Sequence, residues 1–485
     1  MAPTPRGGSL SQQHAVLLTL VTYKVALVLI GLWSQRRTHD GVDFFLGGRQ
    51  LGALVAAVSA SASSSSAWTL LAVSGAAFEF GLSALWLFPA CVGGFLLNWY
   101  VIAPRLRRFG RARDAVTLTE VLAGPEGIEP GARRLVVWVA SLIVLFCFSI
   151  YVGSQFHAAG KTFAETFALD ESKSILLGSA IVLFYTLLGG FWAVSVTDTL
   201  QGLLMAATAL VLPLAALWEV GGFAALAAGV RDVPVQHYLD PLRNFTGPAA
   251  LGFVLGTLGI GIGYPGQPHV VNRFMALRGG SDSLRHARRV ALAWAVVVYA
   301  GMLLLGLCGR VLFGTLGDQE RVFIRASSEL FPPVVAGVMV AAVLSAIMST
   351  ADSQLLVAAS AVTHDLRFGG GDARTMLRRS RIVVFALGLA AVAIALLMIR
   401  HRRIFDSVLF AWSALGAAFG PLLVVTLLRG PVTPRRTLLS MLTGFGLSVL
   451  ASTTTQSPGK VLENVVPFMV ALGIALLPSF TPRRR

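Results

Sequence analysis

Long apolar runs separated by short polar loops dominate this sequence. A helix that spans a bilayer needs about 20 mostly apolar residues, and thirteen runs are long enough to be such helices. They are residues 14–34, 51–81, 83–103, 134–158, 173–193, 195–218, 249–273, 288–313, 331–364, 379–399, 405–428, 437–454 and 462–480. The runs are continuous rather than alternating, which favours helices over barrel strands. The pattern predicts an all-α polytopic membrane protein in which residues 1–485 form a single domain.

Composition supports a protein embedded in lipid. Of the 485 residues, 55% are hydrophobic and 13% are charged, whereas soluble proteins carry about 25% charged residues. A soluble enzyme is therefore excluded. The formal net charge of +16 is dispersed over loops, so we expect no nucleic-acid partner.

The distribution of Lys and Arg predicts the orientation in the membrane. Basic residues concentrate in loops that all fall on one side of the predicted bundle, namely 35–50, 104–133, 274–289, 365–381 and 429–436, together with Arg273 and the C-terminal tail. Positive loops stay cytoplasmic. We therefore expect a protein of the plasma (inner) membrane, with its N-terminus outside the cell and its C-terminus in the cytoplasm. The run 14–34 lacks a small-residue cleavage site, so we interpret it as a retained helix rather than a signal peptide.

Two of the predicted spans contain sequences that disfavour a continuous helix. The second span holds the serine-rich stretch 59–67, and the seventh holds the Gly- and Pro-rich stretch 259–268. Hydroxyls compete for backbone hydrogen bonds, and Gly and Pro weaken or remove the helical ladder. Both spans should break near the bilayer centre, where exposed backbone is tolerated only if it lines a cavity or is buried in protein.

The two breaks lie five spans apart, which suggests internal symmetry. Residues 51–218 and 249–428 would then be two five-helix repeats of opposite orientation, flanked by the extra helix 14–34 and by two C-terminal helices within 437–480. Discontinuous helices at matching positions indicate a secondary transporter with a binding site at mid-membrane depth. The alternative is that small residues merely permit close helix packing.

Oxygen-bearing residues in the ninth span are candidates for binding a monovalent cation. Ala346, Ser349 and Thr350 follow i, i+3, i+4 spacing and share one helical face. Neutral hydroxyls together with carbonyls freed by a broken helix would suit Na⁺, whereas softer metals prefer Cys or His. The alternative is that both hydroxyls bond back to their own helical turn.

Ionisable residues within predicted spans are also functional candidates. Asp352 lies in the ninth span, and Asp198 lies in the first turn of the sixth. At that position Asp198 could instead be a helix-start carboxylate favoured by the helix dipole. The pattern Gly261-x-Gly263-x-x-Gly266 follows no strand, so it does not indicate dinucleotide binding. We find no nucleotide-binding or hydrolase motif, and we expect neither an enzyme nor an ATP-driven pump.

Several motifs, in order along residues 15–480, resemble the sodium:solute symporter family, and most closely its sodium/proline symporters. They are Phe45-Leu-Gly-Gly-Arg49, Tyr185 to Phe191 with Asp198-Thr-Leu-Gln201, Gly263 to His269 with Arg273-Phe-Met-Ala276, Met348-Ser-Thr350 with Gln354-Leu-Leu356, and Gly416 to Pro421. The resemblance implies a leucine-transporter-type fold, alternating access and Na⁺ as coupling ion. It also implies a small-molecule solute and a lipid bilayer as partners, with no obligatory protein partner.

The resemblance assigns roles residue by residue. The family's sodium site maps onto Ala62, Ser65, Ala346, Ser349 and Thr350, and a second sodium site of some members maps onto Asp198, Ser349, Asp352 and Ser353. Solute positions map onto Ser64, Trp68, Tyr151, Ile260, Tyr264 and Pro268. The chain departs from the proline branch at Ser65 (Met there), Ser64 (Asp there) and Ile260 (Trp there).

These observations together predict a sodium-coupled symporter that imports a small organic solute, with L-proline as the first choice. One alternative is a sodium- or proton-coupled carrier of another amino acid, a monocarboxylate, pantothenate or a choline-like compound. Another is a membrane sensor, since some chains of this architecture resemble input domains of signalling kinases. Because the chain ends at Arg485, soon after the last span, we expect no signalling output domain.

Overall fold

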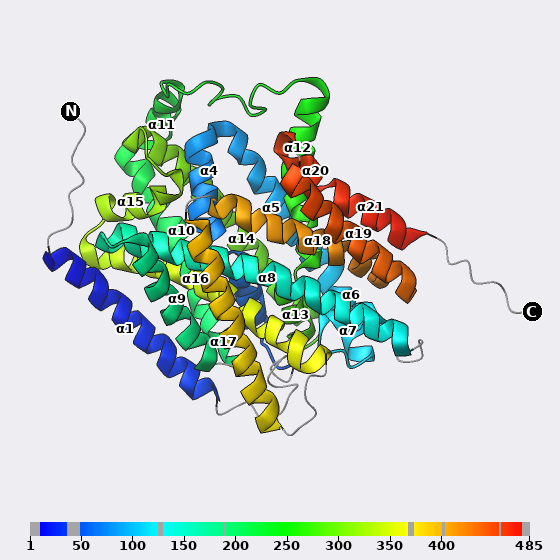
Figure 1. The fold of residues 1–485 in the computed structure, drawn as a ribbon. Coiled ribbons are helices and arrows are strands. Elements are labelled where there is room, and N and C mark those ends of the chain that lie inside the picture. Colours follow the sequence, from blue (N-terminus) through cyan, green and yellow to red (C-terminus); the bar gives the residue numbers. More distant parts are fainter. Residues whose placement is uncertain are drawn as a thin grey trace, which may run out of the picture.

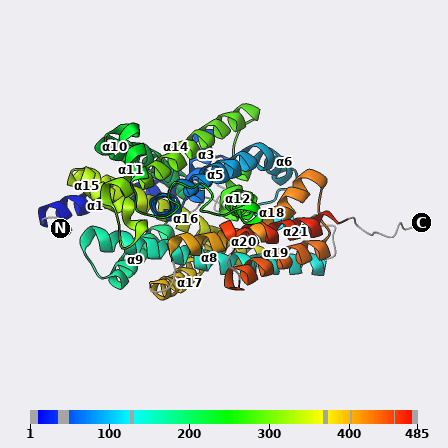
Figure 2. The same cartoon turned by 90° about the horizontal axis from the view of Figure 1, so that it is seen from above.

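The protein is a bundle of helices (Figures 1 and 2). The computed structural model describes residues 10–35, 49–124, 130–188, 191–366, 373–399, 403–454 and 457–477. Within these ranges the only β-type pairing is an isolated parallel bridge between Leu51 and Leu277. The predicted all-α class is confirmed.

Ten stretches of the described chain are long and apolar enough to cross a membrane. They are Gln13–Ile30, Trp68–Ala112, Gly131–Phe167, Ala193–Val220, Gly247–Gly266, Ser281–Phe313, Pro333–Asp365, Arg378–Met398, Ile404–Arg429 and Pro458–Leu476. Helices α9 (Glu171–Leu188) and α19 (Pro434–Thr454) occupy two further predicted spans but are not among the ten. A multi-pass membrane protein is thus supported, while the count of thirteen spans and the inverted repeats stay predictions.

The second predicted span is broken, as expected. Helix α3 (Ala53–Ser64) stops at Ser65, whose φ of −121° and ψ of 83° are not helical. The chain resumes as a π-helical turn, η2 (Trp68–Ala72), and then as α4 (Val73–Phe80). Side chains of Ser61 and Ser64 donate to the carbonyls of Ala57 and Ser61, at 2.8 and 2.9 Å. These local bonds compete with the backbone ladder, which is why a serine run can end a helix at this depth.

The seventh predicted span is also broken. Helix α12 (Gly247–Ile262) gives way to a 3₁₀ turn, η5 (Tyr264–Gly266), and α13 (Pro268–Ala276) begins after Gln267 in extended conformation. Pro268 occupies the first turn of α13, where its missing N–H costs nothing. The break therefore follows from proline and glycine rather than from hydroxyl competition.

The other helices complete the bundle. They are α1 (Leu10–Gln35), η3 (Gly81–Trp86), α5 (Leu87–Leu96), η4 (Leu97–Ile102), α6 (Ala103–Ala112), α7 (Leu118–Ala123), α8 (Pro130–Phe167), α10 (Phe191–Val220), α11 (Gly222–Arg231), α14 (Ser281–Phe313), η6 (Gln319–Arg321), α15 (Val322–Leu330), α16 (Pro333–Ser360), η7 (Ala361–Asp365), α17 (Ala373–Met398), α18 (Ile404–Arg429), η8 (Pro458–Lys460), α20 (Val461–Asn464) and α21 (Val466–Leu476).

Helices α16 and α18 form the interior of the bundle. In the apolar stretch of each helix that could span a membrane, 83% of the residues are buried in α16 and 94% in α18, against 17% in α1. Helix α1 and the α19–α21 pair lie at opposite ends of the molecule (Figures 1 and 2). Helix α3 packs against α10, α13, α14 and α16, so the first break is enclosed by other helices.

The two broken spans are joined at one end. The backbone N–H of Leu51, just before α3, donates to the carbonyl of Ala276 at 3.1 Å, and the N–H of Arg278 donates to the carbonyl of Leu51 at 2.8 Å. These bonds connect the start of α3 to the end of α13. The two half-helices are therefore tied to each other by backbone as well as by side-chain packing.

Candidate functional site

The first break places backbone oxygens against two hydroxyls of α16. The Ser349 hydroxyl lies 3.3 Å from the carbonyl oxygen of Ala62 and 3.3 Å from that of Ala346. The Thr350 hydroxyl donates to the carbonyl of Ser63 at 3.2 Å. All of these residues are fully buried. The expectation that the hydroxyls merely bond back to their own turn fails for Thr350 and holds only in part for Ser349.

We call Ala62, Ser65, Ala346, Ser349 and Thr350 the oxygen cluster. Hydrogen bonds from Ser349 join it to Ala62 and Ala346, and Thr350 is the next residue on α16. Ser65 follows at the break, where its N–H donates to the Ala62 carbonyl at 3.2 Å. The cluster offers carbonyl and hydroxyl oxygens and no side-chain charge. This donor set fits a hard monovalent cation and does not fit a soft metal.

Asp198 does not start a helix, contrary to one expectation. Helix α10 begins at Phe191, about two turns earlier, and the Asp198 side chain is fully buried. Its Oδ2 accepts hydrogen bonds from Ser59, Ser63 and Arg273, at 3.0, 3.1 and 2.7 Å. The helix-dipole interpretation is therefore wrong, and Asp198 is the centre of a buried polar network.

Sequence reasoning missed the role of Arg273. The distribution of basic residues predicts that it flanks a span on the cytoplasmic side, but its side chain on α13 is 1% exposed and pairs with Asp198. The guanidinium also donates to Ser59 at 2.7 Å and to Ser353 at 2.5 Å. The available signal was that Arg273 closes an apolar predicted span, where any ionisable group is a functional candidate.

Asp352 hydrogen bonds to a different helix from Asp198. It is fully buried and bonds to the Thr186 hydroxyl of α9. Lys24 of α1 contacts Met348, one turn before Asp352. The residues predicted for a second sodium site therefore do not form one cluster. Asp198 and Ser353 bond to Arg273, whereas the hydrogen bond of Asp352 joins α16 to α9.

Two of the predicted solute residues meet at the first break. The Tyr151 hydroxyl lies 3.4 Å from the Ser66 hydroxyl, and the Trp68 backbone N–H donates to that same oxygen at 3.2 Å. Gln155, which the sequence did not single out, accepts from the Ala67 N–H at 3.1 Å. The Trp68 ring packs on Phe405 of α18 with centroids 5.6 Å apart. Ser64 donates to its own helix, as described above.

The other predicted solute residues belong to the second break. The Tyr264 hydroxyl bonds to that of Tyr299 at 3.0 Å, and its ring packs against Trp412 with centroids 4.7 Å apart. The carbonyl of Ile260 accepts from the Trp412 indole at 3.1 Å. Pro268 starts α13 and is buried, and the next residue, His269, lies edge-on to Tyr151 with ring centroids 6.2 Å apart.

A cavity of about 530 Å³ opens near Trp68, and we call it the main cavity. Its lining includes Ala72, Ile260, Glu320 and Phe405. Phe405 both lines the cavity and packs on Trp68, so its ring connects the cavity wall to the first break. The size suits a small organic ligand.

Ion pairs surround the main cavity. Glu320 accepts from Lys161 at 2.6 Å and from the N–H of Phe405 at 2.9 Å, and it is only 2% exposed. Arg403, at the start of α18, pairs with Glu79 of α4 at 2.8 Å. These contacts hold the start of α18, and with it Phe405, against α4 and α8.

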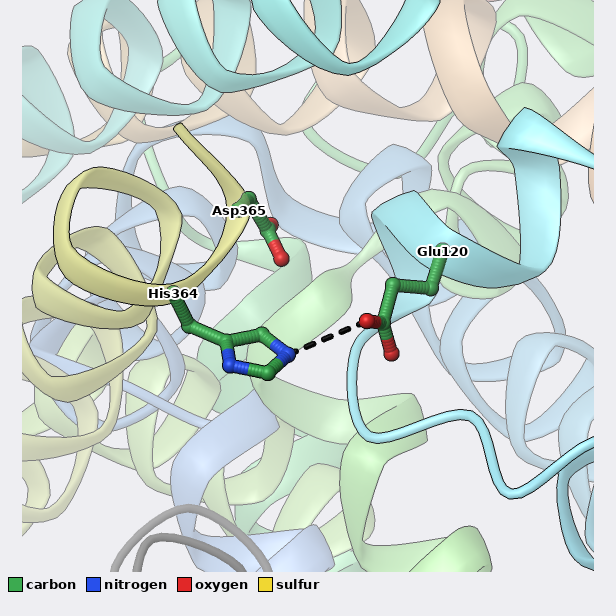
Figure 3. A group of neighbouring side chains, drawn as sticks. All are labelled: Glu120, His364 and Asp365. Carbon is green, nitrogen blue, oxygen red and sulfur yellow. Dashed lines mark hydrogen bonds and ion pairs between the residues drawn. The ribbon is translucent and has the colours of Figure 1, made fainter. Parts of the chain in front are cut away.

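A second group of titratable side chains joins α7 to η7. Figure 3 shows Glu120 of α7 facing His364 and Asp365 of η7. Glu120 bonds to His364 at 3.0 Å and to the N–H of Val116 at 2.7 Å, while Thr117 donates to Asp365 at 2.9 Å. Burial raises the pKa of Glu120, but the bonds from His364 and Val116 lower it more, so the net pKa lies below its ordinary value. The residue types would suit a metal ion, yet the Glu120 carboxylate already bonds to His364 and to the Val116 N–H, and the Asp365 carboxylate accepts from Thr117. We therefore interpret the group as a cross-link.

The comparisons with known proteins agree with this architecture. Residues 44–444 match the sodium:solute symporter family. The osmoregulated proline transporter OpuE of Bacillus subtilis is 34% identical over 97% of this chain and 95% of its own length. The sodium/proline symporter of Escherichia coli is 34% identical over 88% of this chain and 86% of its own length.

A solved structure shares the fold. A Na⁺-coupled sialic acid symporter in a substrate-bound outward-open state superposes with a TM-score of 0.75, over 95% of this chain and 96% of its own, at 17% identity. The transporter MhsT in complex with L-phenylalanine gives a TM-score of 0.51 over 87% of this chain and 97% of its own, at 16% identity. The leucine-transporter-type fold is thus supported by structure as well as by sequence. By its sequence, the chain is a member of the sodium:solute symporter family, and so a transporter rather than an enzyme.

Proposed function

We propose that the protein is a sodium-coupled symporter that carries L-proline, or a closely related small amino acid, by alternating access. The observation that carries the proposal is the oxygen cluster, where Ser349 and Thr350 of α16 meet the carbonyls at the broken end of α3. The choice of proline as solute is supported by the two proline transporters that are 34% identical to this chain.

Na⁺ would replace hydrogen bonds within the oxygen cluster. Each hydroxyl carries one proton and two lone pairs, so Ser349 can turn its proton away from Ala62 and offer a lone pair to the ion. Bound Na⁺ would then connect α3 to α16 more strongly than the 3.3 Å hydrogen bond does alone. The cation would stabilise the state in which the first break is ordered and ready for solute.

The solute would bind beside the ion, between Trp68 and Tyr151. Tyr151 offers a hydroxyl and Trp68 an apolar face, a combination suited to a small zwitterion with an aliphatic ring. Proline would enter through the main cavity once Phe405 moves off Trp68. Closure would return Phe405, and release would follow separation of the helix ends on the opposite side.

The membrane potential would add to the sodium gradient. One positive charge that crosses about 100 mV gains about 2.3 kcal/mol, which corresponds to roughly fifty-fold accumulation. In this proposal the start of α3 and the end of α13 face the cytoplasm, and the main cavity faces outside. The same proposal includes thirteen spans, two inverted repeats and a location in the plasma (inner) membrane. The repeats would comprise residues 51–218 and 249–428.

A different small solute is the second candidate. Ile260 lines the main cavity where proline symporters carry Trp, and Ser64 stands where they carry Asp. Both changes alter the surroundings of the site without removing the oxygen cluster. Another amino acid, a monocarboxylate, pantothenate or a choline-like compound would then be carried with the same ion or with a proton.

Uptake in proteoliposomes tests the proposal. We expect labelled proline to enter only with an inward Na⁺ gradient, and Ser349→Ala to raise the Na⁺ concentration for half-maximal uptake at least about tenfold. Ser360→Ala is the matched control, because Ser360 lies on the same helix and its hydroxyl bonds back to Val357 at 2.8 Å. If proline is not taken up but another solute stabilises the protein against heat in a sodium-dependent way, Na⁺ would remain the proposed coupling ion and proline would be rejected as the solute.

A further inference from the structure

The network around Asp198 holds a buried arginine where sequence reasoning placed a second sodium ion. The Arg273 Nη2 atom lies 2.7 Å from Asp198 Oδ2 and 2.5 Å from the Ser353 hydroxyl. Asp198 and Arg273 are 0% and 1% exposed. A carboxylate buried to this degree requires a positive partner, and in this structure the partner is a side chain.

We infer that the Arg273 guanidinium is the resident cation of the second site, so that the transporter binds a single Na⁺, at the oxygen cluster. The inference rests on the proposed function, because it concerns how many ions accompany the solute. Arg273 contacts two of the residues predicted to hold the second Na⁺, Asp198 and Ser353. It bonds to the same carboxylate oxygen of Asp198, Oδ2, that also accepts from Ser59 and Ser63.

The guanidinium is also connected to the oxygen cluster through two short paths. The Ser353 hydroxyl, which accepts from Arg273, donates to the backbone carbonyl of Ser349 at 2.7 Å. Ser63 donates its hydroxyl to Asp198 at 3.1 Å and accepts from the Thr350 hydroxyl on its carbonyl at 3.2 Å. Arg273 is thus a positioning residue for two sodium ligands, Ser349 and Thr350, and touches neither.

The position of Arg273 on α13 gives this arrangement a mechanical consequence. Its Nε donates to Ser59 of α3 at 2.7 Å, and the backbone bonds between Leu51 and Ala276 already join α3 to α13. The two half-helices therefore form one unit, which the guanidinium fastens to Asp198 of α10 and Ser353 of α16. A fixed charge in this place lets the unit move as a whole without loading and releasing a second ion.

Equilibrium binding of radioactive Na⁺ to the purified full-length protein tests the inference without requiring the solute. We expect about one Na⁺ per wild-type protein and about two in Arg273→Gln, because removing one partner of a buried pair leaves an uncompensated charge that recruits a counter-ion. The double variant Arg273→Gln/Asp198→Asn should return to one. Arg273→Lys, which keeps the charge, should stay at one.

The possible outcomes separate this inference from the proposed function. Two Na⁺ ions in the wild type would overturn the inference and leave a sodium-coupled symporter. No bound Na⁺ in the wild type would overturn the proposed function itself. A stoichiometry of one in Arg273→Gln, both at neutral pH and in mildly alkaline buffer, would overturn the inference, since Asp198 would then form no cation site without the guanidinium.

Controls guard against misfolding. Arg107→Gln is the matched control, because Arg107 is also a buried arginine but donates to the carbonyl of Gly280 rather than to a carboxylate. It should bind one Na⁺. The neutral double variant keeps hydrogen-bonding groups at both positions, so a folded sample remains available if Arg273→Gln alone proves unstable.

Discussion

The two broken spans satisfy their free backbone oxygens with different chemistry. At the first break, hydroxyls of Ser349 and Thr350 bond to the carbonyls of Ala62 and Ser63. At the second break, the carbonyl of Ile260 accepts from the Trp412 indole and that of Tyr264 from the Asn98 amide, at 3.1 and 3.3 Å. Indole and amide N–H groups only donate, whereas a hydroxyl donates or accepts.

Because of this difference, the first break has groups that could coordinate a cation, whereas the second break has groups that only stabilise its backbone conformation. A hydroxyl can release a carbonyl and present its own lone pair to Na⁺, so the first break is able to exchange a hydrogen bond for a cation. The N–H donors of the second break cannot coordinate a cation. They fix the end of α12 against α18 and η5 against η4, and the solute would meet a rigid surface on that side.

Close packing at the second break gives the largest expected effect. A Cβ added at Gly266 would lie 2.6 Å from the Cα of Gly416 and 2.6 Å from the carbonyl oxygen of Leu415. Both neighbours are backbone and cannot rotate away. We expect Gly266→Ala to lower the free energy of unfolding by about 3 kcal/mol and to abolish uptake, as measured by thermal unfolding in detergent and by proteoliposome flux.

A glycine in the same span serves as the control for Gly266→Ala. A Cβ at Gly252 of α12 would meet Val461 at 3.7 Å, an ordinary contact. Gly252→Ala should therefore fold and transport like the wild type. Equal stability of the two variants would contradict the rigid packing that we assign to the second break.

Loss of one hydroxyl at the first break should weaken sodium binding. Thr350→Val keeps the volume and removes the oxygen that bonds to Ser63. We expect the sodium concentration for half-maximal uptake to rise about tenfold, equivalent to about 1.4 kcal/mol, with uptake restored at saturating Na⁺. Thr162→Val is the control, since that hydroxyl bonds within α8 to Ala158 at 2.8 Å. An unchanged sodium dependence in Thr350→Val would remove this residue from the ion site.

The sequence predicted the first break, and the face of α16 that meets it, better than it predicted the charges around them. The serine run and the i, i+3, i+4 spacing of Ala346, Ser349 and Thr350 are local features, and the structure joins them. The pairing of Asp198 with Arg273 joins residues from two separate spans, so no local spacing could reveal it. An arginine at the end of an apolar run is ambiguous until the packing shows whether it reaches the interface or the interior.

The surroundings of the candidate solute residues were predictable only in part, for a similar reason. The Tyr151 hydroxyl and the Trp68 backbone N–H both bond to the Ser66 hydroxyl. The ring and hydroxyl of Tyr264 pack against Trp412 and Tyr299 of other helices. The direction in which a side chain leaves a non-helical turn depends on the φ and ψ angles of that turn, and the sequence pattern does not give them.

Removal of an N–H donor at the second break should affect stability and not sodium affinity. Trp412→Phe leaves the Ile260 carbonyl without its indole partner. We expect the free energy of unfolding to fall by about 1–3 kcal/mol, the cost of an unsatisfied buried polar group. The sodium concentration for half-maximal uptake should stay within about twofold of the wild type. A rise in this sodium concentration as large as that expected for Thr350→Val would contradict the assignment of ion binding to the first break alone.

Contacts outside both breaks should matter least. Because the folded-state pKa of Glu120 lies below its ordinary value, its carboxylate stabilises the fold above the unfolded-state pKa, and that contribution is lost as pH falls through the folded-state pKa. We expect Glu120→Gln to cost under about 1 kcal/mol at neutral pH and to flatten the acid side of a plot of melting temperature against pH. The exposed pair partner Glu329 provides the control Glu329→Gln. A steeper acid dependence in Glu120→Gln would contradict the sign of this shift.

Sodium-dependent proline uptake, measured side by side in Ser349→Ala and Trp412→Phe proteoliposomes over a range of Na⁺ concentrations, tests the central claim most directly. The claim is that the first break, and not the second, binds the coupling ion. We predict that half-saturation by Na⁺ rises at least about tenfold in Ser349→Ala and is unchanged in Trp412→Phe. An unchanged sodium dependence in Ser349→Ala, or an equal shift in both variants, would contradict it.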